Sequence, residues 1–159
     1  MTFTIRQAEK EDASSILELI KGLAIYEKAP NEVISTEEDI IRDGFGEQPF
    51  FHVFIAENEE KHPIGFALFF YTWSTWTGRP TLYLEDLFVN PAFRGQGIGL
   101  ALFKRVAKTA VNEKCQRVEW AVLDWNMLAR DFYHELGASH SQGWLPYRLT
   151  GDALKALAN

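Results

Sequence analysis

A glycine-rich turn in the second half of the chain is the pattern best suited to holding a ligand. It reads Arg94-Gly95-Gln96-Gly97-Ile98-Gly99 and leads into a stripe of apolar residues at helical spacing. Glycines allow backbone N–H groups to approach a ligand closely, and the dipole of a following helix adds partial positive charge. The pattern therefore predicts an anion site suited to phosphate, although the same residues would also form a simple tight turn.

Two other phosphate-binding motifs do not match this turn. A P-loop requires Gly-Lys-Ser/Thr after four spacer residues, and that run is absent from the chain. In the dinucleotide fingerprint the third glycine comes one residue later than Gly99 does, and an acidic residue ends the second strand. Here Glu119 falls inside an expected strand instead. A nucleoside triphosphate and a dinucleotide are both disfavoured as ligands.

Glu85 is a candidate for proton transfer, and Tyr133 is an ionisable residue on the apolar face of an expected helix. Glu85 alternates with Tyr83 and Leu87 along an expected strand, and partial burial among apolar neighbours would raise the pKa of its carboxyl group. Tyr133 lies beside Phe132 on the apolar stripe of an expected helix. Both also have purely structural interpretations, Glu85 as a carboxylate paired with an arginine and Tyr133 as a core tyrosine.

The histidines and the cysteine form no recognisable centre. The four histidines, His52, His62, His134 and His140, fit no metal-ligand spacing, and the nucleophile elbow Gly-x-Ser-x-Gly of serine hydrolases is absent. Cys115 is the only cysteine, which excludes an intrachain disulfide and favours a reducing, cytoplasmic setting. We therefore expect no metal and neither a metalloenzyme nor a serine hydrolase.

Length and composition predict a single globular domain over residues 1–159. Apolar residues make up 47% of the chain and charged residues 24%, a balance typical of a folded protein. The net charge of -6 disfavours nucleic acid as a partner. The longest apolar run, 64–71, is too short to cross a bilayer, and no signal segment opens the chain. Membrane insertion and secretion are not expected.

Hydrophobic periodicity predicts an α/β fold in which helices alternate with strands and position these residues. Strands are expected at 3–6, 50–57, 63–73, 81–89 and 118–123, with a last strand or pair at 143–149. The predicted order is β-α-α-β-β-β-α-β-α-β, followed by a terminal helix at 152–158. Short polar links predict an antiparallel meander over the second to fourth strands, and a crossover encloses the glycine turn. The result is a mixed, mostly antiparallel sheet flanked by helices.

Helix boundaries are predicted by capping residues. Asp12 is expected to cap the first helix, and Ser35 with Glu38 three residues later has the spacing of a capping box for the second. Asn126 is expected to cap the helix that carries Tyr133, and Gly137 to end it in a left-handed conformation.

With these elements in place, the chain resembles the Gcn5-related N-acetyltransferases. The turn at 94–99 matches the family's Arg/Gln-x-x-Gly-x-Gly/Ala motif, which holds the pyrophosphate of acetyl-CoA. The stretches 43–46, 83–86, 124–126 and 132–133 resemble the spermidine/spermine acetyltransferase subfamily. Within it, 74–76 and 121–126 look most like the thialysine Nε-acetyltransferase branch. The resemblance runs from the first strand to about Tyr147 and implies a GNAT-type fold.

The resemblance implies direct transfer of an acetyl group from acetyl-CoA to a primary amine. An alkyl ammonium is only about one part in a thousand neutral near pH 7, so a proton acceptor is required. The resemblance assigns Glu85 as the general base, acting through water, and Tyr133 as the acid that protonates the CoA thiolate. Cys115 is expected to lie away from the site, so no covalent acyl-enzyme is expected.

The resemblance also implies two sets of binding residues. Backbone groups near Leu87 and Val89 would pair with pantetheine and polarise the thioester, and Asn126 would contact the cofactor as well as cap its helix. The pyrophosphate would be held by Arg94, Gly95, Gln96, Gly97, Ile98 and Gly99. The amine would be held by the aromatic and acidic residues Tyr26, Glu27, Trp76, Glu85, Asp86 and Trp144.

Several alternatives remain open at the acceptor site. Trp144 could belong to the sheet core and Trp76 could cap a hairpin. Ser74 and Gln142 stand where polyamine-acetylating members carry acids, which favours a short acceptor such as thialysine over spermidine. A polyamine acetyltransferase is the alternative of the same class, and a non-catalytic acyl-CoA-binding sensor is the alternative of another class. The resemblance further implies a homodimer.

Overall fold

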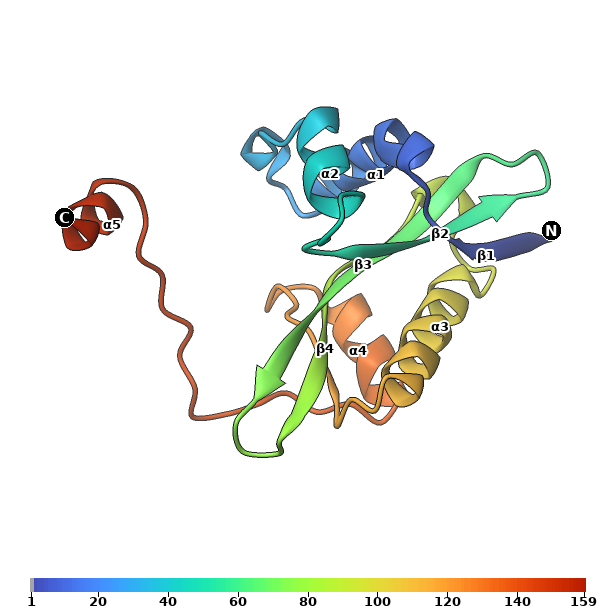
Figure 1. The fold of residues 1–159 in the computed structure, drawn as a ribbon. Helices are drawn as coiled ribbons and strands as arrows, with labels where there is room; N and C mark the ends of the chain where they lie inside the picture. The colour runs from blue at the N-terminus through green and yellow to red at the C-terminus, as the bar shows by residue number, and fades with distance from the viewer. Residues whose placement is uncertain (1) are drawn as a thin grey trace. The chain divides into compact units, whose positions relative to one another are not determined.

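A computed structural model describes residues 2–159 as two compact units, residues 2–121 and residues 122–159 (Figure 1). The first unit is a mixed five-stranded sheet in the spatial order β1-β2-β3-β4-β5. The strands are β1 (Phe3–Gln7), β2 (His52–Asn58), β3 (Pro63–Ser74), β4 (Arg79–Val89) and β5 (Val118–Glu119). The first four pair antiparallel in sequence order, and β5 joins β4 in parallel. The predicted meander and crossover are therefore confirmed.

Three helices cover the two faces of this sheet (Figure 1). They are α1 (Ala13–Tyr26), α2 (Glu37–Gly44) and α3 (Ile98–Asn112), and short 3-10 turns occur at Lys10–Asp12, Pro30–Glu32 and Pro91–Phe93. Within the described residues, no helix of either unit is long and apolar enough to cross a membrane.

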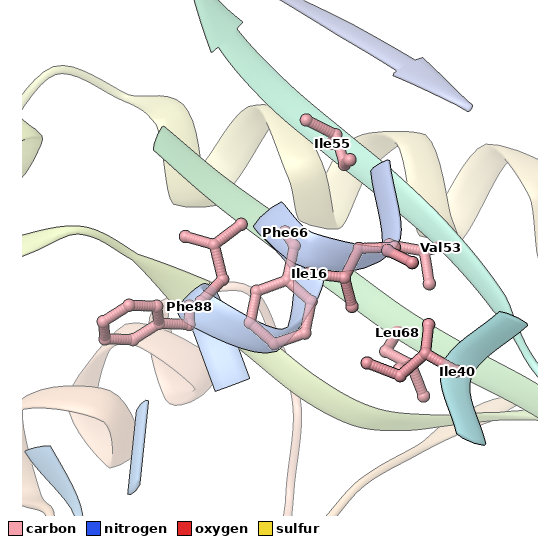
Figure 2. Close-up of a cluster of buried hydrophobic side chains, with 9 residues drawn as sticks. Ile16, Ile40, Val53, Ile55, Phe66, Leu68 and Phe88 are labelled. Carbon is pink, nitrogen blue, oxygen red and sulfur yellow. The ribbon is translucent and has the colours of Figure 1, made fainter. Parts of the chain in front are cut away.

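The main core lies between the sheet and the helices α1 and α2. Figure 2 shows Ile16 and Ile40 from these helices meeting side chains from β2, β3 and β4, among them Phe66 and Phe88. Full burial of each such side chain contributes about 1.5–3 kcal/mol. On the opposite face α3 packs with its own buried stripe, and Arg105 of α3 stacks 4.7 Å from the ring centre of Phe54. The sheet is thus held from both sides.

Two caps in the first unit differ from expectation. The capping box of α2 is one residue later than predicted, because Thr36 Oγ1 accepts from Asp39 N at 3.2 Å and Thr36 N donates to Asp39 Oδ2 at 2.9 Å. Asp12 stands at the N-cap of α1 without capping it. Its carboxylate instead accepts from Arg6 at 2.7 and 2.9 Å, a charge-assisted pairing that lowers the pKa of Asp12.

The second unit contains α4 (Met127–Glu135) and α5 (Gly151–Ala158). Asn126 Oδ1 accepts from Ala129 N at 3.2 Å, and Gly137 has φ +91°, so both predicted ends of α4 are confirmed. The expected strand at 143–149 is wrong. Val122–Asn159 is described throughout and contains no strand, so this unit offers no ladder that could satisfy the backbone of an extended segment. Gly143, at φ +85°, interrupts the extended conformation as well.

Candidate active site

A β-bulge in β4 determines where the candidate catalytic residues point. Leu84 pairs with Phe69 of β3 and Asp86 pairs with Leu68, so Glu85 is an extra residue with no partner opposite it. Cross-strand partners share a face, which places Asp86 and Leu68 on the face covered by α1 and α2. The prediction that Tyr83, Glu85 and Leu87 alternate along one face is wrong, because the bulge interrupts the two-residue period.

The same bulge turns the backbone of Leu87 and Val89 away from β3. Asn90 N donates to Ile64 O at 2.8 Å, so in the alternating ladder Asn90 and Phe88 face β3 while Val89 and Leu87 face the other edge. That edge pairs with β5 only at Leu82 and Tyr83. The expected strand 118–123 is thus limited to Val118–Glu119, and the β4 backbone beyond the bulge is left without a strand partner from the first unit.

On β4, Asp86 is the residue whose carboxyl pKa is shifted by burial. Burial, together with the negative charges of Glu85 and Glu27, raises the pKa of Asp86 to about 7. Glu27 follows the last residue of α1, and burial raises the pKa of its carboxyl as well. Glu85 itself is exposed, so the expected partial burial is wrong. The bulge instead places the half-buried carboxyl one residue further along, at Asp86.

The glycine turn has the backbone that a phosphate group requires. Gly95 and Gly97 both have φ +79°, a left-handed conformation that favours glycine, and α3 begins at Ile98. A Cβ added at either glycine would meet nothing within 4 Å, and both glycines are exposed, so the turn is open to a ligand. At Gly99 a Cβ would lie 3.8 Å from Val89 Cγ2, which places the start of α3 close to β4. These features fit a pyrophosphate at the helix N-terminus.

Arg94 connects the turn to the end of α1. Its Nε donates to Val89 O at 3.2 Å, and its guanidinium lies 4.5 Å from the centre of the Tyr26 ring and 5.7 Å from that of Phe88. Tyr26 is the last residue of α1 and precedes Glu27. The structure therefore brings together residues from the predicted cofactor set and the predicted acceptor set that lie about 70 positions apart in the sequence.

Within one chain, Trp76 lies away from the other residues of the predicted acceptor site. It lies in the turn between β3 and β4, and 86% of its surface is exposed. Asp86 pairs six residues before the end of β3 at Ser74, which corresponds to about 20 Å along the hairpin. Ser74 Oγ accepts from Thr77 N at 3.2 Å and so holds the hairpin turn.

The remaining predicted residues lie in the second unit and are described there by themselves. Tyr133 is on α4, with its ring centre 5.5 Å from that of Phe132, and Asn126 caps the same helix. Trp144 follows α4 and is 74% exposed, so its interpretation as sheet core is wrong. Among residues 2–159, no group of three or more His, Cys, Asp or Glu side chains could hold a metal ion.

Comparisons with known proteins define the class of this chain. The model of the acetyltransferase (GNAT) family matches residues 15–138. The thialysine N-epsilon-acetyltransferase of Mus musculus is 43% identical, and the match covers 97% of this chain and 96% of the relative. The human spermidine/spermine N(1)-acetyltransferase-like protein 1 is 38% identical over 98% of this chain and 24% of its own length. An integron cassette protein from the mobile metagenome of V. cholerae superposes with a TM-score of 0.82 at 29% identity, covering 99% of this chain and 98% of that one.

The chain belongs to the acetyltransferase (GNAT) family, as its turn, sheet and helices predicted. It is an acetyl-CoA-dependent N-acetyltransferase.

Proposed function

We propose that this enzyme acetylates the side-chain amine of thialysine or of a similar amino acid. The observation that carries the proposal is the 43% identity to thialysine N-epsilon-acetyltransferases over nearly the full length of both chains. The acidic cluster of Glu27, Glu85 and Asp86 supports it, because a cationic acceptor needs carboxylates close to the reacting nitrogen.

Two neutral residues, at positions where polyamine-acetylating members carry acids, favour a short substrate. Every protonated nitrogen of a polyamine must find a carboxylate, an aromatic face or water. Ser74 carries no charge, and its hydroxyl is already engaged with Thr77 N. Gln142 is also neutral. Spermidine remains the second candidate, because a human relative of 38% identity is named for spermidine and spermine.

The proposed chemistry assigns one proton transfer to each unit. Bound acetyl-CoA supplies an activated acyl group. Glu85, exposed at the bulge, takes a proton from the ammonium through water and leaves a neutral nucleophile. As the C–N bond forms and the C–S bond breaks, Tyr133 gives a proton to the sulfur. Overall, the amine nitrogen loses two protons. One balances the proton that the new CoA thiol gains, and the other is released to solvent.

Other residues of the proposed site would bind and orient the two substrates. The N–H groups of residues 95–98 and the Arg94 side chain would hold the pyrophosphate, and Gln96 borders them as an exposed residue of the turn. The free edge of β4 at Leu87 and Val89 would pair with the pantetheine amides, and Asn126 would contact the cofactor from α4. Asp86 and Glu27 would attract the amine. No metal takes part in this scheme.

The proposal includes a single catalytic domain, a homodimer and a cytoplasmic location. The family match at 15–138 crosses the boundary between the two units, which supports one domain over residues 1–159. The distance of about 20 Å along the hairpin from Asp86 to Ser74, beyond which Trp76 lies in the turn, supports a dimer, because a second copy could complete the acceptor site. The single cysteine favours a reducing compartment. Light scattering on the purified protein tests the dimer directly.

The substrate is tested by following thiol release with thialysine, lysine, spermidine and putrescine. We expect a higher kcat/KM for thialysine than for spermidine, and the reverse order would overturn the proposed acceptor. Thialysine is also favoured because its sulfur lowers the pKa of the amine relative to lysine. Adding charge with Ser74→Asp plus Gln142→Glu should raise the spermidine-to-thialysine ratio of kcat/KM by at least about tenfold. A complete lack of turnover with every amine would favour a non-catalytic acyl-CoA sensor.

A further inference from the structure

Arg94 is held by groups from two different parts of the first unit. Its Nε donates to Val89 O at 3.2 Å, at the end of β4, and its guanidinium lies 4.5 Å from the centre of the Tyr26 ring. Among residues 2–159, its two terminal nitrogens make no further hydrogen bond that would prevent them from meeting an anion at the turn. The guanidinium thus contacts an aromatic ring while its two terminal nitrogens remain available to an anion.

Tyr26 lies between Arg94 and the carboxyl groups that are proposed to bind the amine. It ends α1, packs against the hydrophobic core and is followed by Glu27. The charge of Glu27 acts on Asp86, so the two carboxyl groups belong to one electrostatic cluster. Tyr26 therefore adjoins, through Glu27, the electrostatic cluster that includes Asp86.

We propose that the stacking of Arg94 on Tyr26 couples acetyl-CoA binding to amine binding, with Arg94 as the positioning residue. This inference rests on the proposed roles of the glycine turn and of the acidic cluster. A pyrophosphate that binds the free edge of the guanidinium restrains its plane, and the restrained plane holds Tyr26 and the end of α1. The coupling is reciprocal, because two ligands that favour the same arrangement each tighten the binding of the other.

The size of the effect follows from the strength of such stacks. A contact between a cation and an aromatic ring changes a binding constant by between about twofold and thirtyfold. The effect is smaller where the contact is exposed to solvent. Tyr26 is half-buried and Arg94 is exposed, so we expect a change of about threefold to tenfold.

The test measures acetyl-CoA binding by calorimetry in variants of a residue outside the turn. Tyr26→Leu should weaken acetyl-CoA binding about threefold to tenfold, and Tyr26→Phe, which keeps the ring, should bind within about twofold of the native protein. Tyr71→Leu is the matched control, because it removes a half-exposed tyrosine ring from β3. In an Arg94→Gln background, Tyr26→Leu should cause no further loss.

The second measurement concerns the amine. With acetyl-CoA saturating, Arg94→Lys should raise the KM for thialysine about threefold to tenfold while kcat changes less, because lysine keeps the charge but not the planar stack. Native acetyl-CoA affinity in Tyr26→Leu, or full additivity of the two substitutions, would overturn the inference. If Tyr26→Leu does not fold, an unchanged KM in Arg94→Lys overturns it instead. Failure of the proposed function is distinguishable, since it appears as the wrong amine preference with the acetyl-CoA results intact.

Discussion

The raised pKa of Asp86 leads to a quantitative prediction about the stability of the fold. Its pKa, raised to about 7 by burial and by the neighbouring charges of Glu85 and Glu27, lies about 3 units above the ordinary aspartate value of 3.8. The folded protein therefore binds a proton at Asp86 between about pH 4 and pH 7 that the unfolded chain has already lost. By linkage, this contribution to the free energy of unfolding is lost as the pH rises through about 7.

Asp86→Asn imitates the protonated form at every pH and should therefore stabilise the fold under alkaline conditions. At about 1.4 kcal/mol for each unit of pKa, the cost of ionised Asp86 reaches at most about 4 kcal/mol, and partial exposure to water reduces it to roughly 2–4 kcal/mol. For a chain of this length, that corresponds to a rise in Tm of at least about 5 °C at pH 8. The rise should fall to less than half its value at pH 5, where native Asp86 is itself protonated.

The assay is a set of thermal melts of the native protein and Asp86→Asn between pH 5 and pH 8. Glu59→Gln is the control, because it neutralises an exposed acid in the turn between β2 and β3 and should show no such pH-dependent gain. The same Asp86→Asn variant should lose about tenfold to a hundredfold in kcat/KM for the amine, since a charge-assisted contact is removed. Equal melting temperatures of native protein and Asp86→Asn at pH 8 would refute the reasoning.

Three further predictions concern the cofactor and the proton transfers. Acetyl-CoA at 100 times its dissociation constant should stabilise the fold by ~2.7 kcal/mol, and Gly97→Asp should abolish the shift, whereas Gly78→Asp, at another left-handed glycine in open space, should keep it. Coincident melts of the native protein with and without acetyl-CoA would contradict the cofactor site. Glu85→Gln should lower kcat mainly at low pH, where fewer amines are already neutral. Tyr133→Phe should lower turnover by about 10²- to 10⁴-fold with little effect on acetyl-CoA affinity, and native turnover of both variants across the pH range would make these residues structural.

The sequence alone determined the features that depend on neighbouring residues. The left-handed Gly95 and Gly97 before α3 follow from local backbone preference, as do the Asn126 cap and the stop at Gly137. Strand and helix periods were sufficient for the order of the elements up to α4, and the short links were sufficient for the meander. These signals also carried the resemblance that led to the family.

Only the tertiary structure decided the features that depend on pairing between distant segments. The bulge at Glu85 exists because β4 carries one residue more than β3 between matched pairs, and no pattern within β4 itself reveals that count. It leaves Glu85 exposed, so that the half-buried carboxyl with the raised pKa is Asp86. The contact of Arg94 with Tyr26 likewise requires the sheet to bring the end of α1 beside the end of β4. The strand expected at 143–149 did not form because an extended segment needs a partner strand, and periodicity within a segment cannot supply one.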